Sequence, residues 1–454
     1  MTVLTYTQAV AQLSALAPEL HTLPSGERRK FTLAEIGLLC AALGDPQRRF
    51  PSVLIAGTNG KGSTAATLAA IAQAAGLRVG LYTSPHLERV NERVRISKDG
   101  WLSEIDDDAF ARHFFAVHDA AQQLVLDGSL RSMPSYFELL TALAFRAFAE
   151  AGVELAVLEV GMGGRLDATN IVEPRISVIT DIALDHQEWL GETIDAIARE
   201  KAGILRDGGV MVTLPQHPEA NQALGEVAVS RNVRGVSAAE YMPARGTVGS
   251  YRLDVMGTPI AVDSPLHGAH QQRNIALAIA AAVELAEQHA FPITPAVIEA
   301  GIRSTVWPGR LETFPVGSEG RSGEPEILLD VAHNPAGAWA LRAAVNALEE
   351  DAPRAPRVLV FGCLRDKPVA ELAQILFPLF DCVVLTTVSS PRAASMDNLR
   401  AAAQATGVRA EQAASVAEAL EQARATATPG GRIVVSGSVY LVGEARHLLR
   451  TEMP

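Results

Sequence analysis

The chain has 454 residues, of which 48% are hydrophobic and 20% are charged, and its formal net charge is −12. A chain of this length is too long to fold around one ordinary hydrophobic core, which predicts two domains or three. The acidic balance argues against a nucleic-acid partner and against binding to an anionic membrane, so an anionic ligand would have to be held by local features.

The cysteines and the apolar runs indicate which cellular compartment to expect. Cys40, Cys363 and Cys382 are far apart in the chain and form no CxxC pair. We therefore expect small buried hydrophobic side chains in a reducing compartment, and neither a disulfide framework nor a zinc site. The N-terminal residues show no basic region followed by an apolar one, which argues against secretion. The longest apolar run, Ile275 to Val283, falls short of the roughly 20 residues that span a bilayer. These observations predict a cytoplasmic protein without a membrane partner.

The first predicted strand, Val53 to Ala56, runs directly into GTNGKGS at Gly57 to Ser63. A helix over Thr64 to Ala75 and a strand over Arg78 to Tyr82 follow, which is the order of a βαβ unit. Glycines in such a loop let backbone N–H groups approach an anion. The sequence therefore predicts a loop that binds a nucleoside triphosphate through Gly57, Thr58, Asn59, Gly60, Lys61, Gly62 and Ser63.

This loop departs from the general P-loop pattern GxxxxGK[ST]. The first glycine of the pattern would fall at Ile55, and Gly62 occupies the position after the lysine where a hydroxyl residue is usual. Lys61 would supply positive charge to the β- and γ-phosphates, and Ser63 would offer a hydroxyl near magnesium. A Gly/Asn turn with a solvated lysine is the alternative interpretation.

Apolar runs alternate with helical patterns along the whole chain, which predicts an α/β fold with mostly parallel sheets. Phe137, Leu140, Ala144 and Phe148 recur at helical spacing and are expected in the core. Further strands are predicted at Leu155–Val160, Ile176–Thr180, Ile327–Val331, Val358–Phe361, Cys382–Thr386 and Ile433–Ser436.

The second half of the chain contains the predicted domain boundary. It lies at Trp307, Pro308 and Gly309, so the domains are expected to span 1–308 and 309–454. A polar loop, Gly317 to Pro325, precedes the first strand of the second domain, and the Ala-rich stretch Leu399 to Ala427 is expected to form surface helices.

Two strand ends carry candidate metal ligands. Glu159 ends the strand that begins at Leu155, where a buried carboxylate would be costly without a cation or partner. His186 follows the strand Ile176 to Thr180, beside the expected nucleotide site. Each has a structural alternative: Glu159 could be a capped or salt-bridged acid, and His186 could be a structural histidine. Ser84 fits a hydroxyl ligand and a Ser-Pro turn cap equally well, and the spacing of Lys201 indicates no more than a solvated helix lysine.

Eight motifs in order give the chain a resemblance to one family, and they extend from about Phe31 to the C-terminus. They are GTNGKGS, TSPHLERVNERVRI, LEVGMGGRLDATN, ITDIALDHQEWLG, REKAGIL, HGAHQQRN, WPGRLE and LLDVAHNPAGA. Together they resemble the folylpolyglutamate synthase/dihydrofolate synthase family of the Mur ligase superfamily. The family's own loop reads AGTNGKGS, so the departures at Ile55 and Gly62 are expected in it.

The resemblance implies a fold and a set of site residues. The fold would be an N-terminal P-loop ATPase-like domain with the folate site, and a smaller Rossmann-like C-terminal domain that binds glutamate and closes over ATP. Ser84, Glu159 and His186 resemble the ligands of two magnesium ions, and Lys201 resembles a lysine that becomes carbamylated. Lys61, Lys201 and His186 would be catalytic, and Asn274, Arg310, Asp330 and His333 match positions that hold the nucleotide.

The implied reaction is ATP-dependent amide formation by a monomeric enzyme. The γ-phosphoryl group passes to a carboxylate of dihydropteroate or a reduced folate, and the amine of L-glutamate attacks the acyl phosphate. Pro134 to Phe137 and Ser84 to Arg95 resemble regions that line the pterin, although a packed aromatic and a solvated loop explain them equally well.

Three other functions compete with this ligase. A Mur-type cell-wall ligase would carry an additional N-terminal domain, for which the early P-loop leaves no expected room. A nucleotide-dependent switch would be expected to carry an NKxD motif, which the sequence lacks. A small-molecule kinase would release ADP without phosphate.

Overall fold

The computed structural model describes residues 5–16, 32–314, 325–348, 356–427 and 431–452. The chain forms two compact units. Unit 1 comprises residues 1–86, 90–265 and 271–306, and unit 2 comprises 87–89, 266–270 and 307–454. The last change of unit falls between Val306 and Trp307, and the predicted domain boundary lies two residues further along. Phe31 and all of the predicted loop Gly317 to Pro325 except its last residue lie outside the described residues.

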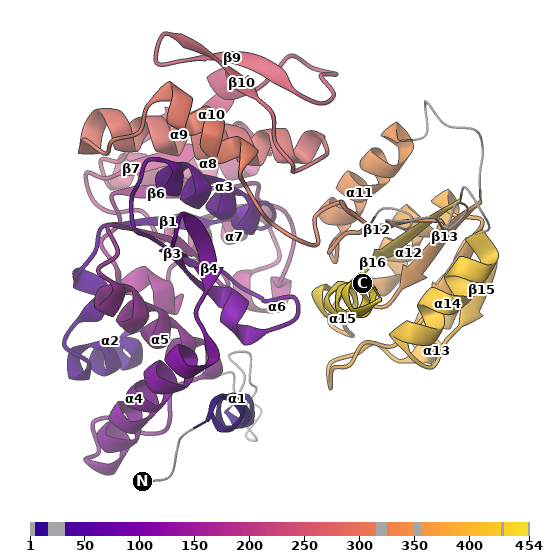
Figure 1. The fold of residues 1–454 in the computed structure, drawn as a ribbon, viewed down its shortest axis with the longest axis horizontal. Coiled ribbons are helices and arrows are strands. Elements are labelled where there is room, and N and C mark those ends of the chain that lie inside the picture. Colours follow the sequence, from indigo (N-terminus) through magenta and orange to yellow (C-terminus); the bar gives the residue numbers. More distant parts are fainter. Residues whose placement is uncertain (1–4, 17–31, 315–324, 349–355, 428–430, 453–454) are drawn as a thin grey trace. The chain divides into compact units, whose positions relative to one another are not determined.

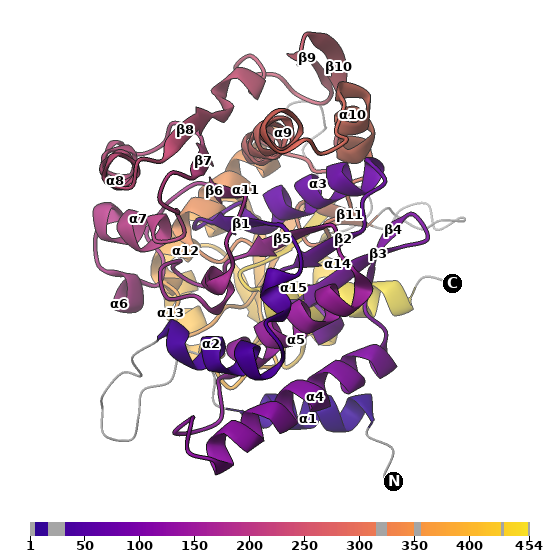
Figure 2. The ribbon, with the colours of Figure 1, turned by 90° about the vertical axis from the view of Figure 1, so that its left-hand side faces the viewer.

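Unit 1 is built on one mostly parallel sheet (Figure 1), and its strand order is β4-β3-β2-β5-β1-β6-β7-β8 (Figure 2). The pairs β2–β3 and β3–β4 are antiparallel, and the other neighbours are parallel. The strands are β1 (Ser52–Ala56), β2 (Val79–Tyr82), β3 (Val94–Lys98), β4 (Trp101–Glu104), β5 (Leu155–Glu159), β6 (Ile176–Ile179), β7 (Val210–Thr213) and β8 (Arg234–Ser237), and a separate antiparallel hairpin contains β9 (Tyr251–Val255) and β10 (Thr258–Val262).

Helices cover both faces of this sheet, as the parallel strands require. Side chains alternate along β1: Leu54 and Ala56 join the core beneath α2, α4 and α5, whereas Val53 and Ile55 join the core beneath α3, α9 and α10. The helices are α1 (Tyr6–Ala15), α2 (Leu33–Ala42), α3 (Lys61–Ala74), α4 (Asp107–Leu126), α5 (Tyr136–Ala151), α6 (Gln187–Leu190), α7 (Ile194–Ala202), α8 (Pro218–Ser230), α9 (Ala269–His289) and α10 (Pro295–Arg303).

Helix α5 shows how the sequence sets one of these elements. Ser135 and Glu138 form a capping box at its N-terminus, and Gly152 ends it with a φ of 63°. All four side chains of the predicted apolar stripe are buried in the core, which confirms that prediction. Helix α1 lies along α4 (Figure 2), and the Tyr6 ring meets Phe110 edge-on with centroids 5.5 Å apart.

Unit 2 contains a second sheet with the order β11-β12-β16-β13-β14-β15, in which only the pair β11–β12 is antiparallel. Its strands are β11 (Glu312–Phe314), β12 (Glu326–Leu329), β13 (Arg357–Phe361), β14 (Cys382–Leu385), β15 (Ala410–Gln412) and β16 (Arg432–Ser436). Its helices are α11 (Pro335–Ala347), α12 (Val369–Leu376), α13 (Met396–Thr406), α14 (Val416–Ala427) and α15 (Val439–Thr451). The predicted Ala-rich helices are α13 and α14, with β15 between them.

The three cysteines are free and buried, as predicted. Burial raises the pKa of Cys40 and of Cys363 to about 12, so these thiols stay protonated at neutral pH. Among the residues that the structure describes, no helix is both long enough and apolar enough to cross a membrane.

Candidate active site

The predicted phosphate loop follows β1, which lies between β5 and β6 inside the sheet. Helix α3 begins at Lys61, and Gly60 precedes it with a φ of 87°. A Cβ at Gly60 would lie 2.1 Å from Oδ1 of Asn274, so the loop fits only glycine there. No side chain caps this helix start, and its first N–H groups therefore suit an anion such as phosphate.

Lys201 of α7 is buried directly beneath this loop. Its Nζ donates to the carbonyl oxygen of Gly57 at 2.7 Å, and Nζ of Lys61 donates to that of Thr58 at 3.2 Å. Burial and the charge of Lys61 lower the pKa of Lys201 to about 7, while Asp185 and Asp167 oppose the shift. A large share of Lys201 is therefore neutral at physiological pH, unlike the solvated lysine that spacing alone suggested.

Ser84 and Glu159 meet at the ends of β2 and β5, which are neighbours in the sheet. The backbone N–H of Ser84 donates to Oε2 of Glu159 at 3.0 Å, and Nη1 of Arg93 donates to Oγ of Ser84 at 3.2 Å. Glu159 is only 4% exposed. Two predicted metal ligands are thus brought together at the carboxyl end of the sheet.

His186 occupies the turn before the short helix α6, with a φ of 51°. Its backbone N–H donates to Oδ1 of Asp185 at 2.9 Å, and its Nε2 lies 4.0 Å from Oδ2 of the same residue. Among the described residues, no three His, Cys, Asp and Glu side chains gather closely enough to hold a metal ion by themselves. A metal here would have to take part of its coordination from hydroxyl, phosphate or water oxygens.

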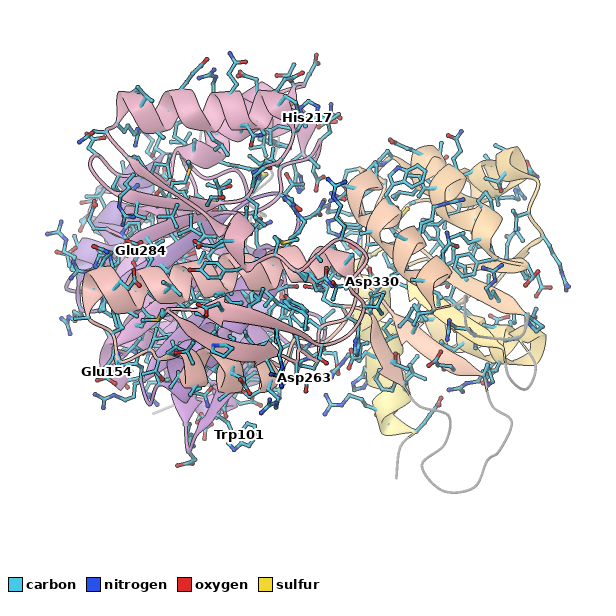
Figure 3. All side chains as sticks on the ribbon, turned by 90° about the horizontal axis from the view of Figure 1, so that it is seen from above. Trp101, Glu154, His217, Asp263, Glu284 and Asp330 are labelled. Atoms are coloured by element: carbon cyan, nitrogen blue, oxygen red, sulfur yellow. The ribbon has the colours of Figure 1, made fainter. Side chains whose placement is uncertain are left out.

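The C-terminal candidates lie in unit 2 around the end of β12. Asp330 is buried (Figure 3) and accepts hydrogen bonds from the N–H groups of Leu311 and Ala332 at 3.0 and 2.9 Å. Burial raises the pKa of its carboxyl above the usual range, although the charges of His270 and Arg310 act in the opposite direction. His333 contacts the carbonyl oxygen of Val331 through Nδ1 at 2.8 Å. Arg310 and His270 therefore lie near enough to Asp330 to favour the ionised form of its carboxyl.

The two aromatic residues expected near the pterin, Tyr136 and Phe137, differ in their exposure. Phe137 is buried in the core, where its ring packs against Tyr82 with centroids 5.9 Å apart. Tyr136 is only partly buried, and the guanidinium of Arg93 lies over its ring at 5.4 Å from the centroid. Tyr136 is therefore better placed than Phe137 to meet a flat ligand.

Sequence reasoning assigned no role to three charged residues around the loop. Asp167 is buried in the turn after β5, and burial raises the pKa of its carboxyl. Asp181 follows β6, and its carbonyl oxygen accepts hydrogen bonds from Thr58 and Asn59. Arg273 pairs with Asp181. Asp167 and Asp181 each follow a predicted strand closely, which is the pattern that could have revealed them.

Comparison with known proteins shows which two domains the chain contains. Residues 110–282 match the model of the Mur ligase middle domain, and residues 309–439 match that of the Mur ligase glutamate ligase domain. The chain is 35% identical over 455 residues to folylpolyglutamate synthase of Lacticaseibacillus casei, covering 98% of each chain. The chain belongs to the folylpolyglutamate synthase/dihydrofolate synthase family. It is an ATP-binding ligase of folate metabolism that adds glutamate to folate-class substrates.

Solved structures of folylpolyglutamate synthases have the same fold. The Mycobacterium tuberculosis enzyme complexed with ADP and AMPPCP superposes with a TM-score of 0.83 at 34% identity, covering 98% of this chain and 99% of that one. Escherichia coli FolC in complex with DHPP and ADP gives a TM-score of 0.80 at 30% identity, with 98% of both chains covered. The predicted α/β class, with a mostly parallel first sheet and a smaller second one, is confirmed.

Proposed function

We propose that this chain attaches L-glutamate both to dihydropteroate and to folyl-glutamates through an acyl-phosphate intermediate. The observation that carries the proposal is the convergence of three features at the carboxyl ends of the adjacent strands β2, β5 and β1. They are the phosphate loop, the buried Lys201 that contacts it, and the Ser84–Glu159 pair. ATP would donate its γ-phosphoryl group to the substrate carboxylate. The amine of glutamate would then attack the acyl carbon and displace phosphate.

Ligand chemistry supports a magnesium site beside the loop. The Glu159 carboxylate and the Ser84 hydroxyl are hard oxygen donors of the kind that Mg²⁺ prefers, and His186 would add an imidazole nitrogen. Bound there, Mg²⁺ would neutralise charge on the phosphate oxygens. Lys61 would hold the β- and γ-phosphates, while the backbone amides of residues 57–63 orient them. Two magnesium ions and the full ligand set remain predictions.

The state of Lys201 supports carbamylation. A carbamate forms when a neutral amine attacks CO2: one N–C bond is made, one C=O π bond opens and leaves its electron pair on oxygen, and a proton leaves the nitrogen for solvent. A pKa near 7 provides the neutral amine. The carbamate would turn the buried Lys201 amine into an anion, and this anion would compensate the positive charge of Lys61.

The remaining assignments rest on the family's motifs. We propose that Asn274, Arg310, Asp330 and His333 contact the nucleotide, with the domains at 1–308 and 309–454. A phosphate contact at Arg310 would link nucleotide binding to closure of the second domain. A monomeric state and a cytoplasmic location also stay predictions.

A substrate-swap assay tests the reaction. Purified protein is incubated with ATP, Mg²⁺, glutamate and either dihydropteroate or tetrahydrofolate, and released phosphate and folate products are measured. We expect phosphate only when acceptor and glutamate are both present. Phosphate release without acceptor, or a phosphorylated acceptor as the final product, would refute the ligase mechanism, and activity with one acceptor alone would refute the dual specificity.

A further inference from the structure

The phosphate loop is joined to the strand end beside it through the backbone of Asp181. The N–H groups of Thr58 and Asn59 donate to the Asp181 carbonyl oxygen at 2.8 and 3.2 Å. The Thr58 hydroxyl also donates to the carbonyl oxygen of Ala183 and accepts from its N–H, both at 3.0 Å. The position of residues 181–183 therefore determines where these two peptide groups of the loop lie.

Arg273 of α9 holds the side chain of Asp181. Its Nε donates to Oδ2 at 2.8 Å and its Nη2 to Oδ1 at 2.5 Å, a bidentate pair that fixes both distance and orientation. Nη2 also donates to the carbonyl oxygen of Pro215 at 3.1 Å, after β7. The two side chains are 28% and 38% exposed, so their attraction contributes little to global stability. The contribution of the pair is to fix the distance and orientation between Arg273 and Asp181.

Helix α9 contacts the loop at a second point through the next residue. Oδ1 of Asn274 lies so close to Gly60 that it occupies the space of a Cβ there, and Nδ2 of Asn274 donates to Gln271 at 2.8 Å. Consecutive residues of one helix thus reach both halves of the loop. Asn274 touches the second half directly, and Arg273 reaches the first half through Asp181.

We propose that the Arg273–Asp181 ion pair positions the phosphate loop for ATP without touching the nucleotide. Arg273 is thus a positioning residue. The proposal rests on the proposed function, since it takes residues 57–63 as the triphosphate site. Without the pair, the loop adopts its binding conformation for a smaller fraction of the time. The apparent affinity for nucleotide falls in proportion to that fraction. The chemistry of the bound state changes little.

Steady-state kinetics and calorimetric ADP binding of Arg273→Met, Asp181→Asn and the double variant test the pair. Each single substitution should raise the KM for ATP and the Kd for ADP about 5- to 20-fold, with kcat and the KM for glutamate nearly unchanged. The double variant should bind ADP no more weakly than either single variant, because both substitutions remove the same interaction. Arg273→Lys should recover part of the affinity. Arg234→Met, which breaks another arginine–carboxylate pair of α9, the one with Glu284 (Figure 3), is the control and should bind ADP normally.

The two single substitutions change the local charge in opposite directions. If Arg273 acted only by attracting phosphate through space, Arg273→Met would weaken ADP binding and Asp181→Asn would strengthen it. That result, additive losses in the double variant, or unchanged ADP affinity in Arg273→Met would overturn the proposal. Asp181→Asn preserves side-chain shape, so it carries the test if Arg273→Met fails to fold. A wild-type protein that binds ADP but ligates nothing would refute the proposed function alone.

Discussion

At the residue scale, Lys201 shows how burial changes the chemistry of one side chain. The residue is only 4% exposed, its Nζ donates to the carbonyl oxygen of Gly57, and its pKa falls from 10.5 to about 7. The unfolded chain holds its proton up to a higher pH than the native protein does. The lysine therefore destabilises the native state at neutral pH, and this cost disappears as the pH rises from about 7 toward 10.5.

Replacement of Lys201 by methionine should make this cost measurable. We expect Lys201→Met to unfold with a free energy about 2–4 kcal/mol larger than the wild type at pH 7, after the lost hydrogen bond is allowed for. The gain should shrink at pH 9 and above, while ligase activity is lost at every pH. Urea unfolding in CO2-free buffer at several pH values measures the difference. A gain that does not depend on pH would contradict the pKa shift.

Gly60 is a second residue whose role can be isolated. Gly60→Ala would place a methyl group on the Asn274 side chain in a backbone conformation that alanine rarely adopts. We expect a loss of about 1–3 kcal/mol in stability and a higher KM for ATP. Gly225→Ala is the control, because that glycine lies in α8 with open space around it and should gain stability. Equal thermal stability of the two variants would argue against the close contact.

The sequence predicted site residues where a local pattern marked them. Glu159 was marked by its position at the end of its strand, whereas Ser84, which follows the neighbouring strand β2, was singled out only by the family motifs. Neighbouring parallel strands bring the two residues together. Arg273 and Asp181 escaped prediction because their pairing depends on how α9 packs across the sheet, and 92 positions separate them in the chain. The buried state of Lys201 escaped for the same reason, since its position in REKAGI resembles that of any helix lysine.

At the element scale, the buried strands were the most predictable part of the fold. The predicted strand Val53 to Ala56 differs from β1 by one residue, because continuous apolar runs mark strands that are covered on both faces. The edge hairpin β3–β4 and the separate hairpin β9–β10 were not predicted. Their residues are partly exposed and mix polar with apolar side chains, so no clear apolar run marks them.

Packing of α10 on α3 depends on a single glycine. A Cβ at Gly301 would lie 2.3 Å from Cα of Ile71, which is backbone and cannot move aside without shifting a helix. We expect Gly301→Ala to lower stability by about 1–3 kcal/mol despite its better helix propensity. Chemical denaturation measures this. Gly37→Ala in α2, where nothing lies within 4 Å, should be neutral or stabilising, and a similar gain at Gly301 would refute the tight contact.

At the scale of the whole molecule, an acidic protein of net charge −12 has to bind anionic ATP through local groups. These groups come together only in the folded protein, so nucleotide should stabilise the native state by mass action. At 100 times its Kd, ADP should add about 2.7 kcal/mol and raise the Tm. Lys61→Met, which lacks the charge facing the phosphates, should unfold at nearly the same temperature with and without ADP. An undiminished shift in that variant would exclude Lys61 from the site.

The buried thiols make the protein suitable for site-specific labelling. Because the native cysteines are covered, and Cys40 and Cys363 hold their protons to about pH 12, a maleimide dye should react first with an introduced surface cysteine. Val229 in unit 1 and Trp339 in unit 2 are 83% and 56% exposed. A donor and an acceptor dye at these positions would report by energy transfer whether the two units move when nucleotide binds, without removal of any natural cysteine.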